Sequence, residues 1–148
     1  MQDLGSFFAY IKEMMEMELK RKNYSSGAPL EAKLGYSRMV EVGPLIMIGG
    51  TTSVQPDGTV YGETAYEQTK YVLEKQIDLL KEAGATKEEV TKIHVFATDM
   101  KDSGDICKAY SELFFEVKPL CTVVGTTALN RPTQFVEIEM EAIKGSHL

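Results

Sequence analysis

Residues 135–143 read FVEIEMEAI, a stretch in which apolar and acidic side chains alternate. A period of two puts neighbouring side chains on opposite faces of a β-strand. One face of the predicted strand is apolar and the other acidic, which separates Val136, Ile138, Met140 and Ala142 from Glu137, Glu139 and Glu141. Strand charges deter aggregation at a sheet edge, but a carboxylate can also hold a water molecule for attack on a small electrophile. The alternation leaves both roles open, and Glu137 is the candidate for the second.

Outward from this strand, the sequence predicts an α+β domain. Apolar residues recur every three or four positions over residues 64–83 and 104–116, which predicts two amphipathic helices. Runs rich in apolar and β-branched residues predict further strands at residues 37–42, 45–50, 91–99 and 120–127. This order favours one sheet with two helices packed on one face. The other face is then either solvated or covered by another copy of the chain.

The N-terminal segment predicts one more helix, over residues 6–22. Ser6 is a suitable N-cap, and the cations of Lys20, Arg21 and Lys22 suit the last turn of a helix. The helix is amphipathic, and we expect it to pack on the body of the protein or on a neighbouring subunit. Residues 1–23 are therefore assigned to an N-terminal helical extension and residues 24–148 to the main domain.

Composition narrows the function classes. The 148-residue chain has a net charge of −6, which argues against nucleic-acid binding because that affinity comes largely from clustered Lys and Arg. No apolar run approaches the roughly 20 residues that span a bilayer, so we expect no membrane partner. The N-terminus lacks a secretory signal pattern, which favours a cytoplasmic location. The two cysteines and two histidines lack zinc-ligand spacing, and we expect no structural metal.

Four further residues have both a structural and a functional interpretation. Gly49 and Gly50 follow a predicted strand, where they allow tight packing or leave amide N–H groups free to bind an oxygen. His94 lies mid-strand without a carboxylate nearby in sequence, which favours a hydrogen-bonded structural histidine. Cys121 has no neighbour in sequence that would lower its pKa, which favours a small buried side chain over a nucleophile.

Taken together, these motifs resemble the reactive intermediate deaminase family, also called RidA or YjgF-like and labelled the L-PSP endoribonuclease family. The resemblance covers about residues 24–144. The segments that carry it, in the family's order, are GYSRMVEVG (35–43), LIMIGGTTSVQPDG (45–58), EQTKYVLEKQIDLLKEAGAT (67–86), VFATDMKD (95–102), AYSELFF (109–115) and FVEIEMEAI (135–143).

The resemblance implies a chorismate-mutase-like α+β subunit with a mixed sheet, assembled as a homotrimer with clefts between subunits. It implies an enamine/imine deaminase, a hydrolase that releases a 2-keto acid and ammonia without a metal or cofactor. By position, Glu137 matches the family's water-positioning glutamate. The substrate-binding positions implied in the same way are Tyr36, Gly49, Gly50, Cys121 and Thr122.

The chain departs from the family at the residue that matters most for substrate charge. Active members carry a cleft arginine in a PAR[ST] segment, and here Cys121 occupies the arginine position in Pro119–Thr122. Losing a bidentate, charge-assisted contact removes the anchor for an anionic imino acid. Arg38, which stands where active members have Gln, and Arg131 are the candidate replacements.

Three hypotheses follow from the sequence. The first is a trimer that binds a small metabolite in its clefts and hydrolyses an enamine or imine, with Glu137 ordering water and Gly50 donating its amide. The second is a non-catalytic member that binds a small ligand or a partner, as the missing arginine suggests. Endoribonuclease action is the weakest, because the chain is acidic and has no histidine pair suited to acid–base cleavage of RNA.

Overall fold

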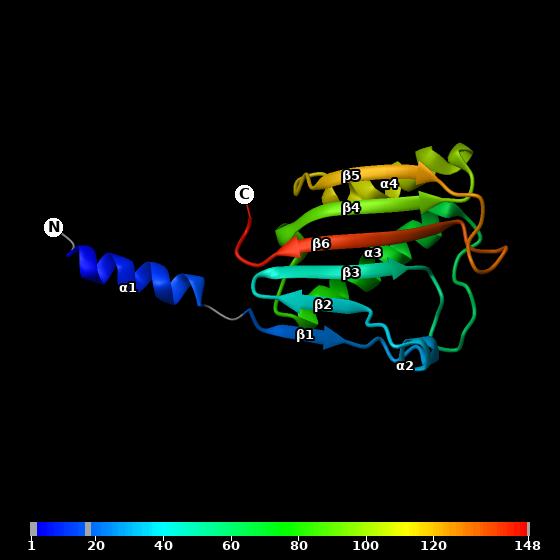
Figure 1. The fold of residues 1–148 in the computed structure, drawn as a ribbon. Coiled ribbons are helices and arrows are strands. Elements are labelled where there is room, and N and C mark those ends of the chain that lie inside the picture. The colour runs from blue at the N-terminus through cyan, green and yellow to red at the C-terminus, as the bar shows by residue number, and fades with distance from the viewer. Residues whose placement is uncertain (1–2, 17–18, 148) are drawn as a thin grey trace.

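The computed structural model describes residues 3–16 and 19–147. Its strands form one six-stranded sheet in the order β1-β2-β3-β6-β4-β5 (Figure 1). All neighbouring strands are antiparallel except β4 and β5, which are parallel, so the sheet is mixed. The elements are α1 (Leu4–Met15), β1 (Arg21–Tyr24), α2 (Pro29–Leu34), β2 (Met39–Val42), β3 (Leu45–Thr51), α3 (Ala65–Glu82), β4 (Val90–Ala97), α4 (Ser103–Phe114), β5 (Leu120–Gly125) and β6 (Val136–Ile143), with short 3₁₀ turns at Lys87–Glu89 and Met100–Asp102.

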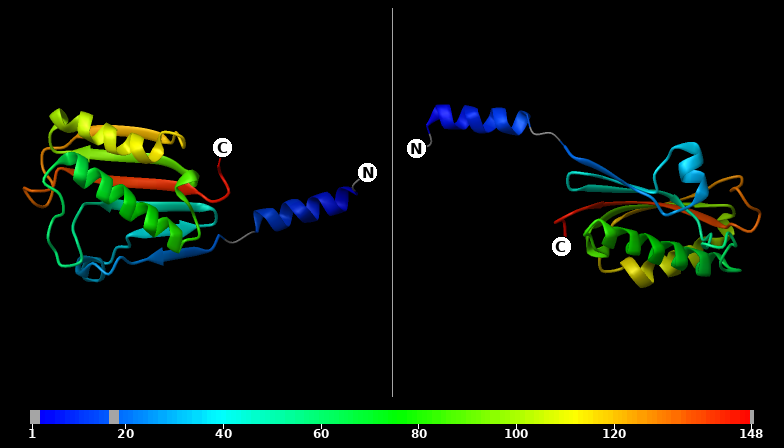
Figure 2. Two further views of the ribbon diagram at one scale, coloured as in Figure 1. Left: turned by 180° about the vertical axis from the view of Figure 1, so that it is seen from behind. Right: turned by 90° about the horizontal axis from the view of Figure 1, so that it is seen from below.

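Helices α3 and α4 cover one face of this sheet, and in the described part of the chain most of the other face is open, with only the short α2 on that side near one corner (Figure 2). The core lies between these two layers. Strand β6 supplies four of its side chains, and α3 adds Val72, Leu73 and Leu80. Buried Gln76 of α3 donates from Nε2 to the carbonyl oxygen of Ile138 at 2.8 Å, which ties the helix layer to the central strand. The predicted α+β class, the mixed sheet and the two helices on one face are confirmed.

The boundaries of α3 follow from its sequence. Thr64 and Glu67 form a capping box, in which each side chain bonds the other residue's backbone N–H. The helix ends at Glu82, and Gly84 then adopts a φ of 75°, a left-handed conformation that suits glycine. The helix predicted over residues 64–83 is confirmed to within a residue at each end.

The N-terminal prediction is wrong in part. The predicted helix ends at Met15, and Arg21 and Lys22 lie in β1 instead of a last helical turn. The reason is tertiary: β1 pairs with β2, with Arg21 opposite Val42 and Tyr24 opposite Met39, and a ladder of backbone hydrogen bonds overrides a local helical preference. The sheet therefore begins before residue 24, inside the segment that was assigned to the extension. Residues 17–18 of the predicted helix lie outside the described residues.

Helix α1 is amphipathic as predicted, but none of its described residues is buried, so it does not pack on the body of its own chain. Figure 1 shows it extending past the end of the sheet. Among the described residues, no helix has the length and apolar character needed to cross a membrane.

The packing of α3 predicts that alanine substitutions at two adjacent residues change the free energy of unfolding by very different amounts. Leu73 is fully buried, whereas Glu74 is exposed. Leu73→Ala should lower the free energy of unfolding by about 2–5 kcal/mol, because it removes apolar atoms and leaves a cavity. Glu74→Ala is the matched control and should change that free energy by no more than about 0.5 kcal/mol. Urea unfolding measures both, and an equal effect of the two substitutions would contradict the observed face of α3.

Candidate functional site

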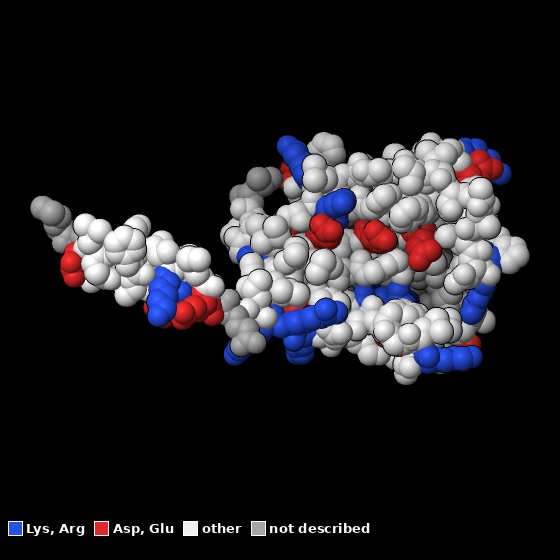
Figure 3. Space-filling model, viewed as in Figure 1, with Lys and Arg blue, Asp and Glu red and all other residues white. Residues whose placement is uncertain are grey.

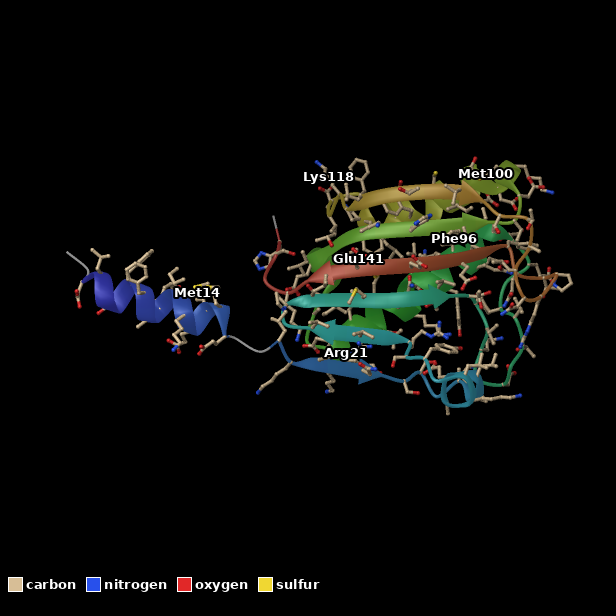
Figure 4. The ribbon with its side chains drawn as sticks, in the orientation of Figure 1. Met14, Arg21, Phe96, Met100, Lys118 and Glu141 are labelled. Atoms are coloured by element: carbon tan, nitrogen blue, oxygen red, sulfur yellow. The ribbon has the colours of Figure 1, made fainter. Side chains whose placement is uncertain are left out.

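The uncovered face of the sheet carries the acidic row predicted from the sequence. Along β6, side chains at 136, 138, 140 and 142 are buried, and the glutamates between them point to the other face. Figure 3 shows these three carboxylates in a line across the middle of that face. Glu137 lies opposite Phe96 of β4, Glu139 opposite His94, and Glu141 opposite Lys92. Phe96 and Glu141 are labelled in Figure 4.

Glu137 packs directly against Gly50. Strand β3 has an irregular register against β6 between Ile48 and Thr51, which brings the backbone of Gly50 close to β6. A Cβ atom added to Gly50 would lie 3.0 Å from Cδ of Glu137 and would collide with its Oε1. Only glycine therefore leaves room for this carboxyl group in its present position.

The surroundings of Glu137 change its acidity. Partial burial raises the pKa of its carboxyl group, the nearby charge of Arg38 lowers it, and Glu139 raises it again, with a net increase in the pKa. A carboxyl group whose pKa moves toward neutrality exchanges protons more readily at physiological pH. Glu137 is therefore easier to protonate than a fully solvated glutamate.

Arg38 reaches the same place from the segment just before β2. Its Nη1 donates to the carbonyl oxygen of Gly50, and its side chain is largely buried. Its Nε lies 3.7 Å from Oε2 of Glu31, and its guanidinium lies over the ring of Tyr36 at 5.7 Å from the centroid. Of the two candidate replacement arginines, the structure brings Arg38 to Glu137, whereas Arg131 is exposed and donates to the carbonyl of Gly58.

Both glycines contact Arg38 through a backbone group. The amide of Gly49 donates to the carbonyl oxygen of Arg38 at 2.9 Å, so of the two interpretations left open for Gly49 the structure shows packing and not a free amide. This bond joins β3 to the segment that carries Arg38. Tyr36, the predicted aromatic of the site, is 42% exposed and lies beside Arg38. Within one subunit, Tyr36, Arg38, Gly49, Gly50 and Glu137 therefore form one cluster.

Cys121 and Thr122 lie outside this cluster. They belong to β5, which is separated from β6 by β4. Thr122 is opposite His94, whereas Cys121 shares its side of β5 with Val123, which packs on the core. Cys121 is exposed at the surface and not buried as expected. Its thiol is nevertheless partly shielded from water, and this desolvation, together with the charge of Cys107 on α4, raises the pKa of the thiol. The Cys121 side chain therefore faces away from Glu137 within the chain.

His94 differs from its sequence-based interpretation. It stacks on Phe96 with ring centroids 4.3 Å apart, but among the described residues its buried Nε2 has no hydrogen-bond partner. The prediction of a hydrogen-bonded histidine is therefore wrong for this atom.

Residues 3–16 and 19–147 contain no group of three or more His, Cys, Asp and Glu side chains that could hold a metal ion.

Sequence reasoning missed Glu31, which is 3% exposed. Its carboxylate accepts hydrogen bonds from the amide and the hydroxyl group of Ser26 and pairs with Arg38. No periodic pattern marks this residue, since α2 spans only Pro29–Leu34. The sequence does contain signals for α2 itself: Pro29 suits the first position of a helix, and Gly35 adopts the left-handed φ of 79° that ends it.

Comparison with known proteins bears on this cluster. The family model described as "Endoribonuclease L-PSP" matches residues 26–144. The chain belongs to the L-PSP endoribonuclease family, whose members are also named YjgF and RutC. A RutC family protein of Pyrococcus abyssi is 37% identical over 109 residues, which is 73% of this chain and 84% of that protein. The crystal structure of a YjgF/YER057c/UK114 family member from Mycobacterium tuberculosis matches with a TM-score of 0.77 and 32% identity, over 84% of this chain and 99% of that one.

A mouse relative has a name that states an activity, "2-iminobutanoate/2-iminopropanoate deaminase". It is 32% identical over 111 residues, which is 74% of this chain and 82% of the mouse protein. The L-PSP family match covers α2 to β6 and leaves out α1 and β1.

The contact between Gly50 and Glu137 predicts unequal effects of alanine at the two adjacent glycines. Gly50→Ala should displace the Glu137 side chain while the fold survives, because a flexible side chain can yield to the added methyl group. At Gly49 an added Cβ meets only ordinary contacts, the nearest being the carbonyl oxygen of Arg38 at 3.6 Å, so Gly49→Ala should leave Glu137 in place. Crystal structures of both variants measure the outcome. An unmoved Glu137 in Gly50→Ala would contradict the packing described.

Proposed function

We propose that the protein binds a small metabolite at the Gly50–Glu137–Arg38 cluster and hydrolyses an enamine or imine there to a 2-keto compound and ammonia. The observation that carries the proposal is the position of Glu137, half-buried against a glycine backbone, with a raised pKa and a guanidinium nearby. Family membership and the name of the mouse relative support the same reaction class.

The reaction assigns Glu137 a defined part. An enamine first takes a proton on carbon and becomes the imine. The Glu137 carboxylate then accepts a proton from water while the water oxygen bonds to the imine carbon, and it passes this proton to the nitrogen as the C=N double bond becomes single. In the resulting carbinolamine the hydroxyl proton passes through the same carboxylate to the nitrogen as the C–N bond breaks, so that one water and one imine give one ketone and one ammonia.

Arg38 takes the role of substrate anchor in this proposal. A guanidinium can bind a carboxylate through two parallel N–H donors, which gives orientation as well as charge. Cys121 cannot make such a contact. Arg38 stands beside Glu137 in the same subunit, so a 2-imino acid held there would place its C2 atom within reach of the glutamate.

A homotrimer completes the proposal. The face that carries the glutamates also carries apolar side chains on the strands to either side, namely Val40, Val42, Leu45, Met47, Phe96, Leu120 and Val124. Contiguous exposed apolar side chains mark protein–protein interfaces, and charged side chains are more common at the rim of an interface than at its core, which suits a site at the margin. Three copies that cover one another's open faces would bury these side chains and close clefts beside Glu137. A cytoplasmic location stays a prediction.

The second candidate is a non-catalytic member of the family that binds a small ligand at the same cluster. It is favoured by Cys121 at the position of the family's arginine. Saturable binding without turnover separates it from the deaminase. Ribonuclease action, suggested only by the family's name, has no support in the acidic composition of the chain.

Ammonia release from freshly generated 2-aminoacrylate and 2-iminobutanoate tests the deaminase. The unmodified protein should accelerate it, and Glu137→Gln should lower the rate by about 100-fold or more, since a positioned general base contributes about 10²–10⁴-fold. Arg38→Gln should mainly raise KM, by about 10-fold or more, because it removes a charge-assisted contact.

Two matched variants complete this assay. Glu139→Gln removes the next carboxylate along the strand and should leave most of the rate. If Glu139→Gln abolished turnover and Glu137→Gln did not, the assignment of the base would be wrong. Activity found only in Cys121→Arg would show that the fold can support deamination but that the unmodified protein does not catalyse it.

The oligomeric state provides a separate prediction. Sedimentation should give a mass about three times that of the 16.5 kDa chain. Val40→Lys should dissociate the trimer, because it puts a charge opposite the apolar Met47, in the face that other subunits cover. Glu82→Lys, an exposed change on the helix side, should leave the mass unchanged. A single-chain mass for the unmodified protein at micromolar concentration would contradict the trimer.

A further inference from the structure

Arg38 lies near two carboxylates but forms an ion pair with only one of them. Its Nε is 3.7 Å from Glu31, whereas no ion pair within 4.0 Å joins it to Glu137 in the described part of the chain. Glu137 is nevertheless close enough for the charge of Arg38 to act on it. The direction in which the Arg38 side chain is held therefore decides whether Glu137 remains unpaired.

Glu31 is built to hold that side chain. Its carboxylate is fixed by the amide of Ser26, which donates to Oε1 at 3.0 Å, and by the Ser26 hydroxyl group. Burial would raise the pKa of Glu31, but the hydrogen bonds from Ser26 and Ser25 and the charge of Arg38 outweigh it, and the net pKa is lowered. Glu31 is therefore a fixed, buried negative charge.

The backbone around Arg38 is fixed as well. The amide of Arg38 donates to the carbonyl oxygen of Tyr24 in β1 at 2.9 Å, and the carbonyl of Arg38 accepts from Gly49 in β3 at 2.9 Å. The carbonyl of Glu31 accepts from the amide of Tyr36, which ties the end of α2 to the segment leading to Arg38. The backbone of Arg38 is therefore held on both sides. Two carboxylates, those of Glu31 and Glu137, lie near its side chain, and the ion pair forms with Glu31.

We propose that Glu31 is a positioning residue of the site: it holds the Arg38 guanidinium on the Gly50 carbonyl and so keeps Arg38 from forming an ion pair with Glu137. Without the Glu31 charge, Arg38 pairs with Glu137 and lowers the basicity of that carboxylate. The consequence for catalysis rests on the proposed function, but the effect on Glu137 itself does not.

The charged groups around the two side chains are few. Besides Arg38, the charged group nearest to Glu137 is Glu139 on the same strand. On β4, Phe96 lies opposite Glu137 and His94 lies opposite Glu139. Arg38 faces Glu31, Glu137 and, from α3, Lys75, whose Nζ donates to the carbonyl of Val54 at 3.1 Å. Lys75 repels Arg38 and is already partnered, so Glu31 and Glu137 are the competing anions.

Titration of the Glu137 carboxyl carbon by NMR in the full-length protein tests the proposal without any substrate. The signal is assigned by its loss in Glu137→Gln. In Glu31→Gln the pKa of Glu137 should fall by about one to three units, the usual effect of a directly paired arginine on a carboxyl group. Glu31→Gln combined with Arg38→Gln should bring it back to the original value or above. Glu41→Gln removes another hydrogen-bonded carboxylate, bonded to Tyr24 and Lys144, and should leave it unchanged.

Ser26→Ala is the milder second variant, because it keeps the Glu31 charge and removes one hydrogen bond. It should shift the pKa of Glu137 in the same direction by a smaller amount, so a failure of Glu31→Gln to fold does not remove the test. An unchanged pKa of Glu137 in the folded Glu31 or Ser26 variants, or a shift that Arg38→Gln does not reverse, would overturn the proposal. If the pKa shifts as expected but no imine is hydrolysed, only the proposed function fails.

Discussion

The strict alternation of side chains along β6 is the constraint on which the rest of the molecule depends. This strand lies at the centre of the sheet, between β3 and β4, and its four buried side chains join the core under α3. A slip of one residue would turn three carboxylates into the core, so the register is strongly determined. The same register puts Glu137 beside Gly50. The position of the proposed base is therefore a consequence of how the core is filled.

Much of the fold could be predicted because its signals are local. The Thr64 capping box and Gly84 bound α3, and alternation marks β6 without reference to any other strand. Strand β1 could not be predicted, because RKNY is short and polar and is held by its partner β2. For the site, the family resemblance suggested that Gly50 and Glu137 act at the same place, and the two residues are in contact in the structure. It could not show that Arg38 joins them or that Cys121 faces α4, since both depend on how separate strands pair.

By the family resemblance, Cys121 stands where active members are expected to have an arginine, and Arg38 stands where they are expected to have Gln. The two positions lie on different sides of Glu137: Cys121 is on β5, beyond β4, and Arg38 precedes β2, beyond β3. A ligand carboxylate bound to Arg38 would approach Glu137 from the β3 side. The preferred substrate therefore depends on the space beside Gly50 and Tyr36, whose aromatic ring lies under the guanidinium.

The most direct test of this account is a crystal structure of the protein with 2-oxobutanoate, the stable 2-keto product of 2-iminobutanoate hydrolysis. The account predicts that the carboxylate of the ligand is bound by the Arg38 guanidinium and that its C2 carbonyl lies within hydrogen-bonding reach of the Glu137 carboxyl group. A ligand bound on β5 beside Cys121 and Thr122, with Arg38 and Glu137 making no contact to it, would contradict the account.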